Sequence, residues 1–379
     1  MKRKENVQKM KYSEMPFPLE KNIVCKEIGE MWKKGWLDCY DKEHFLIRCI
    51  YGDDKFIRRI FSHEKYTYEG TLPLNADTFI MNLSVKLGGL IQFFGEEKIK
   101  HFIMEQMSAG KKHYNQNVFF QALAEVEILL YFISFGSVYE KNGEYEPRLN
   151  LGKANPEARI VYGDGIILDI EVKMPEFRDI LTKADTYMPL LLLNDNGRKE
   201  FSKLCKSIGA VDKFPRVLKI KDFLNSACSK FQEIEDENQF NILFINWTFT
   251  DIPVNGYFEA CSILYNDTNG ILKHPNVAKS MGISEDVFKK ISAVFVYEDP
   301  DEMMIFQDFR FLFASKKAAL LTNPFLIKNN AQELKIRKVM NFREGDFRWN
   351  KDLLLNFSVE YPRKFILRKF EKIILENVL

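Results

Sequence analysis

Residues 155–173 read NPEARIVYGDGIILDIEVK, and the expected fold is built around this stretch. Over 166–173 it has the residues of a strand, in which successive side chains point to opposite sides. Glycine, aspartate and glycine at 163–165 tolerate the positive φ angles of a tight hairpin turn. The charged face of the strand carries Asp169, Glu171 and Lys173, and the apolar face carries Ile170 and Val172.

Glu157 lies one hairpin before Glu171, so the two carboxylates are expected to face each other across neighbouring strands. Phosphodiester hydrolysis needs an attacking water, neutralisation of the phosphate charge and help for the leaving oxygen, and a hard divalent cation contributes to all three. We expect Mg²⁺ or Mn²⁺, held by Glu157, Glu171 and the backbone carbonyl of Val172. Lys173 can reach the attacking water or a phosphate oxygen, so its expected role is water activation or charge stabilisation in the transition state.

These residues resemble the motif of the PD-(D/E)xK nuclease superfamily, the fold of many restriction enzymes, repair nucleases and junction resolvases. Pro156-Glu157 corresponds to the family's Pro-Asp, and Glu171-Val172-Lys173 corresponds to its Glu-x-Lys. The resemblance implies an α/β fold with a restriction-endonuclease-like core, a central mixed sheet flanked by helices. Glutamate stands at position 157 where the family usually has aspartate, and the longer side chain shifts the metal unless the backbone compensates.

A long apolar helix is expected before the hairpin, over residues 117–136, which read NVFFQALAEVEILLYFISFG. Glu125 and Glu127 are its only acids. A carboxylate in apolar surroundings is costly without a partner, so at least one of the two is expected to face the site or a cation. The resemblance favours Glu125 as a further catalytic carboxylate, with Glu127 as the alternative.

A second helix is expected over residues 219–232, KIKDFLNSACSKFQ, followed by a buried core strand at 240–247. The resemblance implies that this helix presents a lysine or glutamine toward the site, and Lys230 and Gln232 are the candidates. Asp169 is a further supporting residue. The strands expected in the sheet are 137–141, 157–163, 166–173, 241–248, 291–297 and 304–313.

A chain of 379 residues with 46% hydrophobic content is too long for one simple domain. We expect a mostly helical N-terminal region over 1–100, whose role the sequence does not reveal. The nuclease-like domain is expected over 101–315, with an insertion at about 174–218 that borders the substrate cleft, forms dimer surface or simply packs. A basic C-terminal region follows over 316–379.

The formal net charge is only +2, so a nucleic-acid footprint has to come from local clustering. From residue 316 onward, fourteen lysines and arginines stand against seven acids, as in an electrostatic clamp on a nucleic-acid backbone. Aromatic residues alternate with arginines there, which suits stacking on bases, although the aromatics could equally be core. The candidate nucleic-acid contacts are Arg343, Arg348, Trp349, Arg363 and Lys364.

The six cysteines form no C-x-x-C pair and the five histidines show no ligand spacing, so neither set predicts a zinc site. The histidines are expected to be surface or packing residues. The start of the chain lacks the apolar stretch of a signal peptide, and we expect no run of membrane-spanning length. A reducing cytoplasm with free thiols is the expected setting.

The function expected is a divalent-metal-dependent nuclease, specifically a DNA endonuclease of a bacterial restriction or antiviral defence system. DNA is favoured over RNA as the partner, and a homodimer or larger complex is expected because a duplex cut on both strands requires two sites. The alternative is a catalytically degenerate nuclease fold that serves as a nucleic-acid-binding or scaffold subunit. The plainest alternative is a surface hairpin with solvated charges.

Overall fold

The structure is a computed structural model, and the residues that it describes are 11–20, 22–55, 75–110, 113–134, 141–149, 154–175, 187–189, 199–200, 202–203, 206–207, 211–213, 217–247, 257–266, 270–297 and 318–340. The chain forms two compact units. Unit 1 comprises Met1–Phe135 with Pro300–Phe311, and unit 2 comprises Gly136–Asp299 with Leu312–Leu379.

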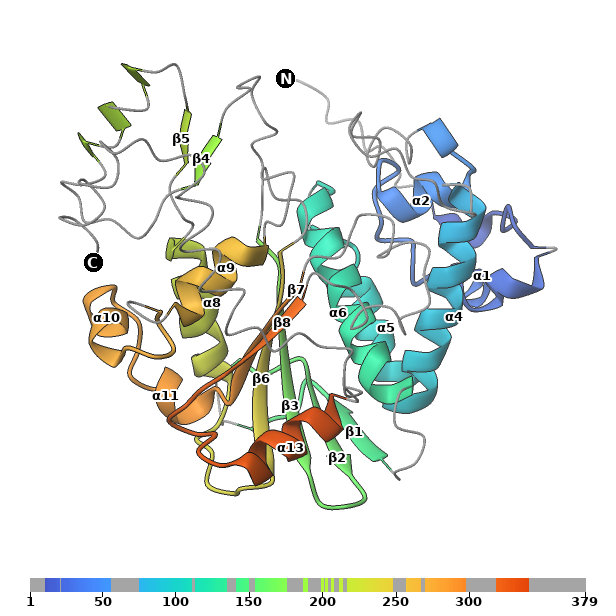
Figure 1. The fold of residues 1–379 in the computed structure, drawn as a ribbon. Helices are drawn as coiled ribbons and strands as arrows, with labels where there is room; N and C mark the ends of the chain where they lie inside the picture. The colour runs from blue at the N-terminus through green and yellow to red at the C-terminus, as the bar shows by residue number, and fades with distance from the viewer. Residues whose placement is uncertain are drawn as a thin grey trace, which may run out of the picture. The chain divides into compact units, whose positions relative to one another are not determined.

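Unit 2 is built on a six-stranded mixed sheet in the order β1-β2-β3-β6-β7-β8 (Figure 1). Its strands are β1 (Lys141–Tyr145), β2 (Ala158–Tyr162), β3 (Ile167–Lys173), β6 (Gln239–Asn246), β7 (Ala293–Tyr297) and β8 (Ala318–Thr322). Neighbouring strands are antiparallel in β1-β2-β3, parallel in β3-β6-β7 and antiparallel again in β7-β8. The expected α/β architecture with a mixed sheet is therefore confirmed.

Helices cover one face of this sheet. They are α8 (Val217–Lys230), α9 (Tyr257–Tyr265), α10 (Pro275–Ser280) and α11 (Val287–Lys290), and Figure 1 shows α8, α9 and α11 along one side of the strands. Two crossovers, β3 to β6 and β6 to β7, step across the sheet in the same direction, and right-handed crossovers then place both sets of helices on one face. Phe231, Leu243 and Val294 are among the buried side chains of the core between them.

The sequence of the central strands matches their position. β6 is buried along almost its whole length and β7 throughout, as expected for parallel strands covered on both faces. β1 reads KNGEY, and its two charged residues and glycine suit the edge of a sheet, where they discourage pairing with another chain. The sheet therefore places its apolar strands in the middle and its polar strand outside.

The hairpin between β2 and β3 has the expected turn. Gly165 donates its backbone N–H to the Tyr162 carbonyl at 2.9 Å, and Gly165 has φ +82°, a conformation that favours glycine. The turn sets the register in which Ala158 pairs with Ile170 and Arg159 with Asp169. Glu157, one residue before β2, donates its N–H to the Ile170 carbonyl at 2.9 Å.

Unit 1 is helical in its described residues. Its elements are η1 (Tyr12–Glu14), η2 (Ile23–Cys25), α1 (Lys26–Lys33), α2 (Phe45–Ile50), α4 (Ala76–Phe94), α5 (Glu96–Glu105) and α6 (Gln116–Ser134). α4 packs closely on α6, since a Cβ added at Gly89 would lie 3.0 Å from Leu130. Asn75 caps α4 by accepting a hydrogen bond from the Thr78 N–H at 2.8 Å.

The boundaries of the units differ from the expected ones. The helix expected over 117–136 exists as α6 but belongs to unit 1, so the chain divides near residue 135 and not near residue 100. At the other end, β8 pairs with β7, and α13 (Asn330–Val339) follows it. Both elements lie beyond residue 315, and β8 completes the sheet of unit 2.

Other expected elements lie wholly or partly outside the described residues. Of the strand expected at 137–141 only residue 141 is described, as the start of β1 (Lys141–Tyr145), and the expected strand at 304–313 lies outside the described residues. Within the insertion, β4 (Tyr187–Pro189) and β5 (Val211–Lys213) form a two-stranded parallel sheet. Most other residues of the insertion lie outside the description.

One apolar run does reach membrane-spanning length, contrary to expectation. It is the window Gln116–Ile133 of α6, of which 72% is buried inside the protein. A core helix passes the same test of length and composition, and the packing of α6 on α4 gives it that character.

Candidate active site

Two glutamates and two lysines converge at the end of the β2–β3 hairpin. Glu157 and Glu171 are both buried, and the Glu171 side chain is 0% exposed. Lys173 Nζ lies 2.5 Å from Glu171 Oε1. The hairpin accounts for the convergence, because Glu171 and Lys173 share the face of β3 that carries Asp169, and the hydrogen bond from the Glu157 N–H to the Ile170 carbonyl holds Glu157 next to Glu171.

The fourth member of the cluster comes from outside the hairpin. Lys230 is the last residue of α8, and its Nζ lies 2.7 Å from Glu171 Oε1 and 3.1 Å from Glu157 Oε1. One ammonium thus bridges both carboxylates. The side chain of Lys230 is 16% exposed, so the bridge is largely shielded from solvent.

The carboxylates retain coordinating capacity beyond these ion pairs. Glu171 Oε2 is buried and accepts no hydrogen bond from any described residue, which is unfavourable for a charged oxygen unless a cation compensates. Because Ile170 and Val172 are two residues apart on β3, their carbonyls point to the same side, toward β2. The Ile170 carbonyl accepts the Glu157 N–H, whereas the β2–β3 register ends at Ile170 and pairs no β2 residue with Val172. The two carboxylates, with the Val172 carbonyl as a third donor, are the kind of oxygen ligands that Mg²⁺ or Mn²⁺ takes.

Electrostatics distinguish the members of the cluster. Burial, together with the charge of Glu157, raises the pKa of Glu171 to about 7, although Lys173 and Lys230 oppose the rise. Burial would lower the pKa of Lys230, but the charges of Glu157 and Glu171 outweigh it and keep the pKa above its ordinary value. Lys230 therefore stays protonated at neutral pH, and Glu171 is the group that exchanges a proton there.

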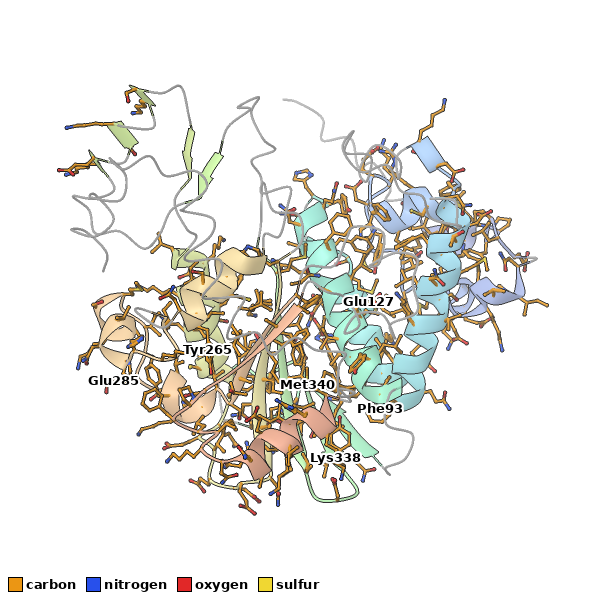
Figure 2. All side chains as sticks on the ribbon, in the orientation of Figure 1. Phe93, Glu127, Tyr265, Glu285, Lys338 and Met340 are labelled. Atoms are coloured by element: carbon orange, nitrogen blue, oxygen red, sulfur yellow. The ribbon has the colours of Figure 1, made fainter. Side chains whose placement is uncertain are left out.

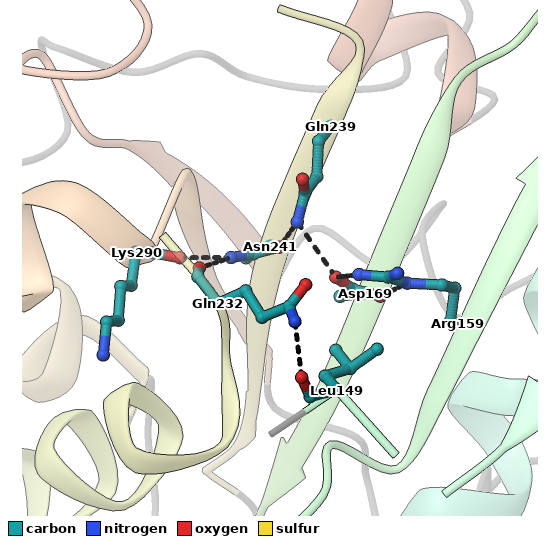
Figure 3. A network of polar contacts seen from close by, with 7 residues as sticks. All are labelled: Leu149, Arg159, Asp169, Gln232, Gln239, Asn241 and Lys290. Carbon is teal, nitrogen blue, oxygen red and sulfur yellow. Dashed lines mark hydrogen bonds and ion pairs between the residues drawn. The ribbon is translucent and has the colours of Figure 1, made fainter. Parts of the chain in front are cut away.

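Figure 3 shows a network of polar contacts around Asp169, which lies two residues before Glu171 on β3 and therefore on the same face of the sheet. Arg159 donates from Nε to Asp169 Oδ1 and from Nη2 to Asp169 Oδ2, each at 2.7 Å. Gln239 on β6 donates to Asp169 Oδ2 at 3.3 Å and to Asn241 Oδ1 at 3.3 Å. Asp169 is thus a structural neighbour that fixes β2, β3 and β6 together.

Gln232 does not turn toward the carboxylates as expected. The Gln232 side chain donates from Nε2 to the Leu149 backbone carbonyl at 2.5 Å, and the Gln232 backbone carbonyl accepts from Asn241 Nδ2 at 2.9 Å (Figure 3). Gln232 lies just past the end of α8, after Lys230 has been presented to the site. It therefore anchors the segment that follows Lys230.

The two acids of α6 differ in their surroundings. Glu127 forms a buried ion pair with Lys86 of α4, so one of the two does face a cation, and Figure 2 labels Glu127 on α6. Burial raises the pKa of Glu127, and the charge of Lys86 opposes the rise. Glu125 is also buried. Because α6 belongs to unit 1, the assignment of Glu125 to the hairpin site stays a prediction.

The described residues contain no group of three or more histidine, cysteine, aspartate or glutamate side chains in an arrangement that could hold a metal. The hairpin supplies two carboxylates, and the third expected acid lies in the other unit. The candidate nucleic-acid contacts Arg343, Arg348, Trp349, Arg363 and Lys364 lie outside the described residues.

Three residues of the network around Asp169, namely Arg159, Gln239 and Asn241, were not predicted from the sequence. Arg159 had a readable signal, because it lies two residues after Glu157 and a hairpin with this turn sets it opposite Asp169. Gln239 and Asn241 had none, since their partners depend on the pairing of β3 with β6 across 65 intervening residues.

The histidines and cysteines were expected to have no catalytic role, and His44 has a structural role in unit 1. His44 is buried and caps α2, accepting the Leu46 N–H at Nδ1, and its Nε2 lies 2.8 Å from the Met107 carbonyl.

The described cysteines are all free thiols, namely Cys25, Cys39, Cys49, Cys228 and Cys261. Cys205 lies outside the described residues.

Comparisons of the chain with protein-family models, with curated proteins and with solved structures found no match.

Proposed function

We propose that the chain is a divalent-metal-dependent nuclease that hydrolyses phosphodiester bonds, with Glu157, Glu171 and Lys173 at its centre. The observation that carries the proposal is that both carboxylates meet on one cation at the end of the hairpin. Glu157, Glu171 and the Val172 carbonyl would hold Mg²⁺ or Mn²⁺, and the bound ion would neutralise phosphate charge and favour ionisation of a water. A restriction-endonuclease-like topology for the core is part of this proposal.

Lys173 is the residue proposed to act on the attacking water or on a phosphate oxygen. Its ammonium lies against Glu171, and its side chain is 22% exposed, so Lys173 is held in place while its side chain remains partly accessible from solvent. A positioned ammonium can stabilise charge that develops on a phosphate oxygen, and it can donate or accept a proton once its surroundings change. Glu125 is proposed as an additional carboxylate of the site, supplied by α6.

DNA is the proposed substrate, and restriction or antiviral defence in a bacterium is the proposed setting. Both rest on the resemblance of Pro156-Glu157 and Glu171-Val172-Lys173 to the nuclease motif. The basic C-terminal region is proposed to contact the nucleic-acid backbone, and a dimer would provide one site for each strand of a duplex.

A second candidate is a protein that keeps this fold without the reaction and binds nucleic acid or a partner. The observation that favours it is that Lys230 already neutralises both carboxylates. Titration with Mn²⁺ separates the two candidates, because an active enzyme binds the ion through Glu157 and Glu171 and a degenerate protein does not.

The test is cleavage of plasmid, single-stranded DNA and RNA by the full chain with Mg²⁺, Mn²⁺ or EDTA. We expect cleavage of DNA with either ion, none with EDTA, and loss of cleavage in Glu171→Gln and Lys173→Ala with folding retained. Lys279→Met is the matched control, since Lys279 pairs with Glu285 on the surface, away from the cluster. Full cleavage by Lys173→Ala would overturn the proposed role of this residue.

A further inference from the structure

The Lys230 ammonium lies between the two carboxylates of the cluster and pairs with both. Its Nζ is 2.7 Å from Glu171 Oε1 and 3.1 Å from Glu157 Oε1. A divalent ion held by both carboxylates would bind oxygen at about 2.0–2.1 Å for Mg²⁺, and it would need the space between the same two side chains. The ammonium thus stands where an ion that bridges Glu157 Oε1 and Glu171 Oε1 would bind, although Glu171 Oε2 remains open to it.

We propose that Lys230 is a built-in counter-cation that a divalent metal must displace, so that Lys230 sets the metal affinity of the site. The inference rests on the proposed function in that it takes Glu157 and Glu171 to be the metal ligands. Without metal, Lys230 holds the two carboxylates together. With metal, the ammonium leaves the bridge and becomes available to an anionic group of the substrate.

Charge and geometry single out Lys230 for this role. Two carboxylates and two ammoniums balance in the cluster, and a divalent ion added beside both ammoniums would face repulsion at short range in a poorly solvated site. Within the described residues Lys173 pairs with Glu171 at 2.5 Å, whereas Lys230, at the end of α8, pairs with both Glu157 and Glu171 and so holds the place between them.

The first experiment measures Mn²⁺ binding by calorimetry at pH 8 in the metal-stripped full chain without nucleic acid. We expect Lys230→Met to tighten the Kd for Mn²⁺ by about tenfold, because removal of a charge-assisted contact to the ligands removes the competitor. The same variant should melt at a lower temperature than wild type when metal is absent. A lysine that merely supports the site would weaken Mn²⁺ binding when it is removed.

The matched control is Lys290→Met. Lys290 is 19% exposed and pairs with Asp286 at 3.1 Å, so it resembles Lys230 in burial and pairing but contacts a different carboxylate. We expect its Kd for Mn²⁺ to equal that of wild type. Glu171→Gln identifies the site, because it should abolish the Mn²⁺ binding that is due to the cluster.

The second experiment uses the wild-type protein and so does not depend on the folding of a variant. Acylation of lysine amines, measured by mass spectrometry with and without Mn²⁺, should rise severalfold at Lys230 when the ion is added and stay constant at Lys290. Unchanged or lower labelling of Lys230 overturns the inference.

The outcomes separate the inference from the proposed function. Mn²⁺ binding that is lost in Glu171→Gln but equal or weaker in Lys230→Met overturns the inference and leaves the metal site standing. Absence of Mn²⁺ binding from both wild type and Lys230→Met overturns both. Binding by Lys230→Met alone supports the inference.

Discussion

Arg159 and Asp169 lie directly opposite each other on β2 and β3 and are joined by two parallel hydrogen bonds of 2.7 Å each. The Asp169 side chain is 0% exposed, and the hydrogen bonds to it raise the pKa of the Arg159 guanidinium. This pair locks the two strands one row away from Glu157 and Glu171. The positions of the candidate ligands therefore depend on a salt bridge that does not itself belong to the cluster.

Removal of the arginine should be far more harmful than removal of a surface partner. Arg159→Met leaves the buried Asp169 carboxylate without its bidentate partner, and we expect a loss of about 3–5 kcal/mol in the free energy of unfolding. The double variant Arg159→Met/Asp169→Leu should lose less than the sum of the single variants. Urea denaturation measures each value.

A surface salt bridge nearby provides the control. Lys338 of α13, labelled in Figure 2, pairs with Asp164 in the hairpin turn at 2.8 Å and is 46% exposed. Lys338→Met should cost no more than about 1 kcal/mol. Equal losses in Arg159→Met and Lys338→Met would contradict the structural role of the buried pair.

Metal binding should depend on pH through Glu171. Its pKa of about 7 means that the carboxyl group holds a proton in the metal-free protein below neutral pH, and the proton must leave before the oxygen can bind a cation. The affinity for Mn²⁺ should fall by up to about tenfold for each pH unit below about 7 and change little above about 8. Calorimetry at several pH values, in buffers of different ionisation enthalpy, measures both the affinity and the released proton. A pH-independent affinity between pH 6 and 8 would count against Glu171 as a ligand.

His44 should make the protein sensitive to mild acid. Burial lowers its pKa to about 4 from the ordinary 6.5, because protonation is opposed by desolvation. The unfolded chain therefore binds the proton first as pH falls, so the stabilisation is complete above about 6.5 and is lost as pH falls toward about 4. The loss is of the order of 3 kcal/mol at about 1.4 kcal/mol per pKa unit.

The variant His44→Asn tests this assignment. Asparagine retains a cap acceptor for the Leu46 N–H but does not titrate. We expect the variant to be less stable than wild type at pH 7, because it loses buried ring contacts, and to show a flatter decline between pH 6.5 and 4. Urea midpoints across that range measure the slope. Parallel slopes in the two proteins would assign the acid sensitivity to other groups.

The two acids of α6 should separate into a structural and a catalytic residue. Lys86→Met leaves Glu127 buried without its cation, and we expect a loss of about 3–5 kcal/mol in stability with little change in the Kd for Mn²⁺. Glu125→Gln should reduce DNA cleavage by at least about tenfold if Glu125 joins the reaction. Plasmid cleavage and urea denaturation, run on both variants, distinguish the two roles. Full cleavage by Glu125→Gln would remove Glu125 from the proposed site.

Local patterns predicted the hairpin and the central strands well. Glu157, Glu171 and Lys173 converge because strand alternation and a glycine turn act over a few residues, and both are readable from sequence. β8 was not expected, because the short run Ala318–Thr322 becomes a strand by pairing with β7. The apolar character of α6 all around its axis predicted its burial but not which helices would bury it.

The contact of Lys230 with both carboxylates could be anticipated only through the resemblance. Nothing in the sequence of α8 shows which of its lysines faces the sheet, because Lys219, Lys221 and Lys230 all occur in one amphipathic stretch. The lysine that faces the sheet is determined by the rotation of α8 about its own axis. The buried core between α8 and β6 fixes that rotation. Gln232, only two residues away, consequently turns to Leu149 instead.

The turn at Gly165 has a consequence for how this chain can vary. Side chains alternate along a strand, so a slip of β2 by one residue against β3 would carry Glu157 to the opposite surface of the sheet while Glu171 stayed where it is. Insertion or deletion of a single residue between Tyr162 and Ile166 would thus separate the two carboxylates without altering either one. The length of a solvent-facing loop that touches none of the reacting groups is as tightly constrained as their chemistry.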